Sequence, residues 1–174
     1  AAGKQFTPEY LFNHISRNLT HSLTKTDLWK EMPEGDEPDF HFFIYYIPRR
    51  STASAVMIVG AEDEKHVKNV VMWTILGFPL TSVAIPVWIE GGNKLPEAVT
   101  MKADQHSPIC DAAMKMKQDC FPLTRDDGKN YINLTAVINS LNTGYLQRLR
   151  PVENEIFSKA DILNTGLDKD QKTK

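Results

Sequence analysis

The sequence has few of the features on which self-contained catalytic or metal sites are built. It contains no G-x-S-x-G, no Walker loop, no H-E-x-x-H and no C-x-x-C. His14 and His21 lie seven positions apart, whereas paired metal ligands on a helix are usually about four apart. His66 lies in a charged loop, where we expect it to be solvated, and His41 and His106 have no nearby partner in the sequence. We therefore expect no metal and no cofactor.

Cysteine is scarce, with only Cys110 and Cys120 in 174 residues. Both fall in a stretch with a helical pattern, where a rise of about 1.5 Å per residue would place them ~15 Å apart. A disulfide needs Cα atoms within roughly 7 Å of each other. We expect two unpaired, buried thiols.

Charge of one sign and long apolar runs are also lacking. The formal net charge is -2, and the basic residues are scattered, which argues against nucleic acid as a partner. The most apolar run, Ile75 to Ile89, is broken by Pro79 and Pro86 and is too short to span a bilayer. We interpret it as core sheet and expect no membrane partner.

The length and the 41% hydrophobic content suit one domain with a full core. We assign residues 1–163 to a single α+β domain and expect the polar, lysine-rich segment 164–174 to be a mobile tail. The chain opens Ala1-Ala2-Gly3-Lys4, with neither an initiator methionine nor a signal-peptide pattern. Such a start suggests processing or a boundary within a longer protein.

The pattern of elements predicts helix, antiparallel sheet, then helices. Thr7-Pro8-Glu9 is a helix start, followed by a stripe at helical spacing from Leu11 to Leu23 that includes Ile15. Strand-like runs cover 40–47, 52–59, 69–76 and 81–89. The near-continuous apolar character of the third and fourth runs predicts cover on both of their faces. Later helices are expected from Ser107-Pro108, over 134–141 before Gly144, and from Pro151. This order leaves sheet edges that another polypeptide would pair or cover.

The densest pair of cations stands at the start of a strand, in the stretch R-R-S-T-A-S-A-V-M-I-V-G that begins at Arg49. One interpretation is a site that holds an anion or a carbonyl, with Arg50, Ser51, Thr52 and Ser54 as the binding residues. Because side chains alternate along a strand, these residues would divide between its two faces. The alternative is a solvated strand end.

Arg17 is the other candidate. It lies beside Ile15 on the predicted apolar stripe, so its guanidinium would reach towards the sheet. The alternative is a helix arginine whose stem packs on the surface while its charge stays in water.

Three segments together resemble a known family: S-R-N-L-T-H-S-L-T-K-T-D-L-W from Ser16, the stretch from Arg49, and M-W-T-I-L-G-F-P-L-T-S-V-A-I-P-V-W-I from Met72. They are similar to the second half of N-terminal-nucleophile hydrolases of the linear-amide type, the group of isopenicillin N acyltransferase, penicillin V acylase and bile salt hydrolase. The likeness is greatest to secreted Bacteroidetes proteins of that group, and it covers roughly residues 7 to 96.

The resemblance implies half of an αββα sandwich and the cleavage or transfer of an acyl group at a linear amide bond. In the family, an N-terminal cysteine attacks the carbonyl and its own amine acts as the base. The position matching Arg17 stabilises the anionic intermediate, and the region of Arg50 to Ser54 would line the pocket of a small amide substrate. The resemblance also implies a secreted or periplasmic location.

The first residue departs from the family, because Ala1 stands where the nucleophile would be and both cysteines are internal. The chain is then either the C-terminal portion of an enzyme whose nucleophile lies in another half or subunit, or a non-catalytic relative that binds a ligand or partner. The oligomeric state stays open, with a homo-oligomer among the alternatives.

Overall fold

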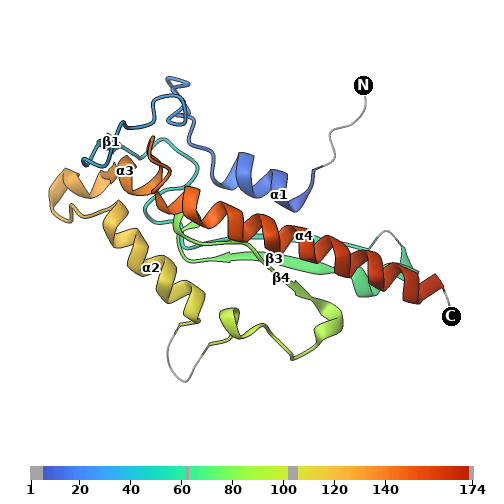
Figure 1. The fold of residues 1–174 in the computed structure, drawn as a ribbon. Coiled ribbons are helices and arrows are strands. Elements are labelled where there is room, and N and C mark those ends of the chain that lie inside the picture. The colour runs from blue at the N-terminus through green and yellow to red at the C-terminus, as the bar shows by residue number, and fades with distance from the viewer. Residues whose placement is uncertain (1–5, 62, 102–105, 173–174) are drawn as a thin grey trace, which may run out of the picture.

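The computed structural model describes residues 6–61, 63–101 and 106–172, which form a mixed α+β structure with antiparallel strands (Figure 1). The first half holds the short helix α1 (Pro8–Leu11), a π-helical turn (Phe12–Ser16) and strands β1 (Phe40–Phe42), β2 (Ser54–Val59), β3 (Val71–Leu76) and β4 (Ile85–Trp88). The second half holds helix α2 (Pro108–Cys120), strand β5 (Tyr131–Asn133), helix α3 (Leu134–Val137) and the long helix α4 (Tyr145–Lys172). Short 3₁₀ turns cover 64–69, 79–81, 89–91, 97–99 and 126–130.

The central sheet has the order β2-β3-β4, and both neighbouring pairs are antiparallel, which confirms the pairing predicted for these three strands. Met57 lies opposite Trp73, and Trp73 opposite Pro86. The predicted tight turn after β3 is also present. Gly77 adopts φ +86° there, and a Cβ on it would lie 2.6 Å from the Cβ of Ala113, so glycine allows α2 to approach the turn.

The prediction of a strand over 40–47 is wrong beyond Phe42. β1 has three residues and pairs with β5 in a separate two-stranded ribbon. At Phe43 the chain turns inward, and this ring stacks on Tyr46 with centroids 4.5 Å apart inside one of the two core clusters. Burial of aromatic area by a turn therefore overrides the strand preference of this run.

The second core cluster lies between the central sheet and helix α4, where Phe12, Trp73, Ile75, Phe157 and Ala160 are buried. Figure 1 shows α4 running along this sheet. Cover on both faces, predicted for the third and fourth strand-like runs, is only partial for β3, where Thr74 is 5% exposed on the face away from the cluster but Met72 is 38% exposed.

On β2 the side chains alternate. Ala55 and Met57 pack on the cluster, whereas Val56 and Ile58 are 56% and 68% exposed on the opposite face. Met72, which pairs with Ile58, is also exposed on that face. Within the described chain, one face of β2 is therefore packed on the core and the other is largely exposed.

The first helix is shorter than predicted. Thr7 caps it as expected by accepting the Tyr10 N–H, but helical structure ends at Ser16. Beyond it the Asn18 side chain accepts the Thr20 N–H, and a bridge joins Thr20 to Asp27. Ile15, placed on the buried stripe by its spacing, is 50% exposed, and Arg17 points into the interior instead.

Helix α4 begins at Tyr145, ahead of the predicted start at Pro151, which lies inside it, and continues to Lys172. Its predicted contacts through Phe157 and Ala160 are confirmed, whereas Leu163 is 55% exposed. The mobility assigned to 164–174 stays a prediction. The helix expected over 134–141 is shorter than predicted, because only α3 is helical there. The predicted helix start at Ser107-Pro108 is confirmed. Both cysteines are free, as predicted. No helix among the described residues is long and apolar enough to cross a membrane.

Candidate functional site

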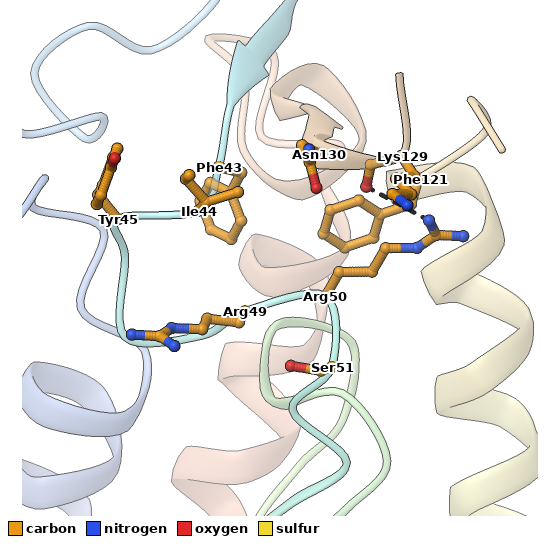
Figure 2. Close-up of a pocket in the computed structure, with 9 residues that line it drawn as sticks. All are labelled: Phe43, Ile44, Tyr45, Arg49, Arg50, Ser51, Phe121, Lys129 and Asn130. Atoms are coloured by element: carbon orange, nitrogen blue, oxygen red, sulfur yellow. Dashed lines mark hydrogen bonds between the residues drawn. The ribbon is translucent and has the colours of Figure 1, made fainter. Parts of the chain in front are cut away.

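The two adjacent arginines stand on a tight turn that precedes β2. The Thr52 N–H donates to the Arg49 carbonyl at 2.9 Å, and the Arg49 N–H donates to Thr52 Oγ1 at 3.0 Å. These reciprocal bonds fix the turn and leave the side chains of Arg49, Arg50 and Ser51 on its outside. Figure 2 shows the two arginine side chains extending from the turn in opposite directions.

This turn forms one wall of a cavity of about 700 Å³. A second cavity, of about 500 Å³, adjoins it and shares Arg50 and Phe121 with it. We call the two cavities together the Arg50 groove. The first is lined by Phe43, Ile44, Tyr45, Arg49, Arg50, Ser51, Phe121, Lys129 and Asn130 (Figure 2). The second is lined by Arg50, Met114, Lys117, Gln118, Phe121, Pro122 and Thr124.

Arg50 lies where the two cavities meet. Its guanidinium carbon is 5.9 Å from the centroid of the Phe121 ring, which is a cation–π arrangement. Its hydrogen bond to protein is a long one, from Nη1 to the Lys129 carbonyl at 3.4 Å. Among the described residues, no carboxylate pairs with Arg49, Arg50, Lys117 or Lys129. The groove therefore combines aromatic surface with positive charge that the protein does not neutralise.

Lys117 reaches the groove from helix α2, with its ammonium 5.3 Å from the centroid of the Phe78 ring. Burial lowers the pKa of Lys117 below its usual value, and the positive charge of Arg50 lowers it further. Both causes disfavour the charged form of Lys117 in the empty groove.

Arg17 lies in different surroundings. Its Nε donates to the Pro79 carbonyl at 2.8 Å, and its Nη2 donates to the Ser82 carbonyl at 2.9 Å. Both terminal nitrogens also donate to the Glu153 carboxylate, at 2.5 and 2.7 Å, and Nη1 has a further contact of 3.4 Å with Asn13 Oδ1. Every N–H of this guanidinium therefore has an acceptor. In this arrangement no donor is free for a bound anion.

Arg17 also borders a separate, polar cavity of about 370 Å³. His14, Asp27 and Trp29 line it, together with Arg150, whose guanidinium carbon lies 5.0 Å from the centroid of the Trp29 ring. Arg17 does not line the Arg50 groove, so the structure does not bring it together with the other predicted site residues.

Of the residues predicted to bind a ligand, Arg50 and Ser51 line the groove. Thr52 and Ser54 do not line the groove. The hydroxyl of Thr52 accepts a hydrogen bond that fixes the turn, and Ser54 is an exposed residue at the start of β2.

Phe43, Lys117, Phe121 and Asn130 also line the groove but were not predicted from the sequence. They come from three separate segments, since Lys117 lies in α2 and Phe121 directly follows it, and no local pattern connects them to Arg50. The pairing of β1 with β5 brings two of the segments together, because the Phe43 N–H donates to the Asn130 carbonyl at 2.8 Å just beyond the ribbon.

Across the described parts of the chain, no cluster of three or more histidine, cysteine, aspartate or glutamate side chains is arranged to hold a metal ion. Comparison of the chain with protein-family models, with curated proteins and with solved structures finds no match.

Proposed function

We propose that this chain is a binding domain for a small organic anion, which it holds in the Arg50 groove. The observation that supports this proposal is the contrast between two arginines, the buried Arg17 and the partly buried Arg50. Arg17 is 2% exposed and has a carboxylate and two backbone carbonyls as partners. Arg50 borders two cavities and lies over an aromatic ring, and no carboxylate among the described residues pairs with it.

The walls of the groove indicate the rest of the ligand. Phe43 and Phe121 are 2% and 4% exposed and present aromatic surface to the cavity, and Ser51 and Asn130 offer a hydroxyl and an amide. A guanidinium that lies over an aromatic ring and makes one long hydrogen bond to protein keeps N–H groups for an oxyanion. The groove therefore suits an acidic group attached to an apolar, planar body.

A calorimetric titration with benzoate tests the proposal, with benzamide as the neutral compound of the same shape. We expect benzoate to bind and benzamide to bind at least about tenfold more weakly, since a hydrogen bond to a charged group contributes about 1.5–3 kcal/mol. Arg50→Gln removes this preference. Arg125→Gln, which removes an exposed charge outside the groove, preserves it. Equal binding of the two compounds would contradict the proposal.

A second candidate is the one implied by the family resemblance: a portion of a cysteine-nucleophile amide hydrolase or acyltransferase, secreted or periplasmic, with half of an αββα sandwich. Two observations favour it. Arg17 is buried beside a polar cavity and does not point into solvent. The exposed apolar face of β2, with Val56 and Ile58, suits the second sheet of such a sandwich.

In this candidate the nucleophile comes from polypeptide outside these 174 residues. Arg17 must then give up one of its present hydrogen-bond acceptors in order to bind the anionic intermediate. Intact mass and N-terminal sequencing of the protein purified from its full-length gene test it. A companion polypeptide that begins with cysteine supports the hydrolase. A product without such a polypeptide leaves only the anion-binding function.

A further inference from the structure

The second cavity of the Arg50 groove holds two cations that approach from different elements. Arg50 stands on the turn before β2, and Lys117 projects from helix α2. They are close enough for the charge of Arg50 to contribute to the lowered pKa of Lys117. No acidic side chain lines this cavity. Asp119, two positions beyond Lys117, accepts a hydrogen bond from Tyr145 Oη at 2.5 Å instead.

Two like charges that face one cavity without an acid repel each other. A monoanion such as a carboxylate offsets one of them, and a dianion offsets both. We propose that the second cavity binds the doubly charged phosphoryl group of a phosphate monoester, with Arg50 and Lys117 as its two cationic ligands.

The other side chains of this cavity fit a phosphoryl group. Gln118 offers amide N–H groups and Thr124 offers a hydroxyl, and both residues line this cavity. A phosphoryl group presents three acceptor oxygens, and arginine binds two of them through its planar fork while lysine acts as a point charge.

The esterified body of the ligand has a place as well. Phe121 borders both cavities, so a planar group attached to the phosphate continues along this ring into the first cavity towards Phe43. This inference rests on the proposed function, because the phosphoryl group is the acidic group for which the groove was proposed.

Phenyl phosphate and phenyl sulfate form the test pair. They share the ring and a tetrahedral oxyanion, but near pH 7.5 the phosphate is mostly a dianion, since its second pKa is about 6, while the sulfate is a monoanion. We expect calorimetry to show phenyl phosphate binding at least about tenfold more tightly than phenyl sulfate. Lys117→Gln abolishes that preference, Lys117→Arg retains it, and Lys115→Gln, on the same helix but outside the cavity, leaves it unchanged.

Three other outcomes would each count against the phosphoryl site or against the proposed function. If both compounds bind the protein equally and Lys117→Gln changes nothing, the phosphoryl site is refuted, whereas the anion-binding function stands. If Lys115→Gln weakens binding as much as Lys117→Gln, the effect is general surface charge, and the site is again refuted. If neither compound nor benzoate binds the unmodified protein, the proposed function fails together with the inference drawn from it.

Discussion

Arg17 and Glu153 lie 136 positions apart in the sequence, yet Arg17 Nη1 donates to Glu153 Oε2 at 2.5 Å, and each side chain is 2% exposed. Glu153 Oε1 accepts from Arg17 Nη2 at 2.7 Å and from the Ala84 N–H at 2.5 Å. The pair therefore ties the segment after the first helix to helix α4 and to the start of β4. The positive charge of Arg17 is therefore balanced by the negative charge of Glu153 in the protein interior.

Removal of either partner is expected to destabilise the fold strongly. Arg17→Met or Glu153→Leu leaves a buried charge without its partner and should lower the free energy of unfolding by about 3–5 kcal/mol. The double variant should recover a large part of that loss, because it leaves neither charge. Urea unfolding of the two single variants and the double variant measures the coupling.

The exposed pair Lys159–Glu155 on the same helix, with side chains 71% and 64% exposed, serves as the control. Lys159→Met should leave the unfolding midpoint within error, because solvent screens such a pair. A loss of similar size at Arg17 and at Lys159 would show that the Arg17 pair has no special structural role.

Much of the fold was predictable where a local signal and the tertiary packing agree. The Thr7 cap, the antiparallel order of β2, β3 and β4, and the glycine turn at Gly77 have local causes that the sequence displays. The first helix was overextended because Leu19 and Leu23 continue its spacing, although the chain has already turned at Asn18. Spacing records where apolar residues recur and does not show where the backbone reverses.

The charge of Lys117 should reduce the stability of the folded protein. Its pKa is lowered from the ordinary value of 10.5 by burial and by Arg50, so the folded state binds the proton less readily than the unfolded state. The penalty is full at neutral pH and disappears as pH rises through the lowered pKa towards 10.5. Lys117→Met, which keeps the stem, should therefore be more stable than the unmodified protein at pH 7 and lose this advantage near pH 10.

Chemical unfolding at both pH values checks this prediction. A variant that is less stable at pH 7, or an advantage that does not change with pH, would mean that the Lys117 charge is not disfavoured in the groove.

Tyr145 should ionise later than an ordinary tyrosine. Its hydroxyl donates to Asp119 Oδ2 at 2.5 Å, and this hydrogen bond, together with burial, raises the pKa of Tyr145 to about 12. The raised pKa stabilises the fold below pH 10, and this contribution is lost as pH rises through about 12. Carbon-13 NMR of the tyrosine rings, assigned with Tyr145→Phe, should place its midpoint well above 10, and Asp119→Ala should return it towards 10.

The two thiols should differ in reactivity. Cys120 is completely buried, and burial raises its pKa to about 12, whereas Cys110 on the same helix is partly exposed. Because the thiolate is the reactive form, iodoacetamide at pH 8 should modify Cys110 in the native protein and Cys120 only after unfolding. Peptide mass spectrometry distinguishes the two sites. Equal labelling rates, or a disulfide between the two, would contradict the packing of α2.

Only part of the candidate site could be predicted from the sequence. Arg50 and Ser51 attracted attention because cations adjoin an apolar strand, but Lys117 and Phe121 stand more than 60 positions later and enter the site only through the packing of α2. How many hydrogen-bond acceptors surround each arginine could not be predicted from the sequence either. The family resemblance favoured Arg17, and the engagement of Arg17 with Glu153 depends on a helix whose start was itself predicted too late.

The central claim is that Arg50 is the arginine available to an anion and Arg17 is not. NMR of the arginine Nε–H groups during a titration with phenyl phosphate tests it most directly. We predict that the Arg50 resonance shifts progressively with ligand, while the Arg17 resonance stays in place and exchanges slowly with solvent because its proton is donated to the Pro79 carbonyl. A shift of Arg17 with Arg50 unchanged would contradict the claim and would place the site at the family-like position instead.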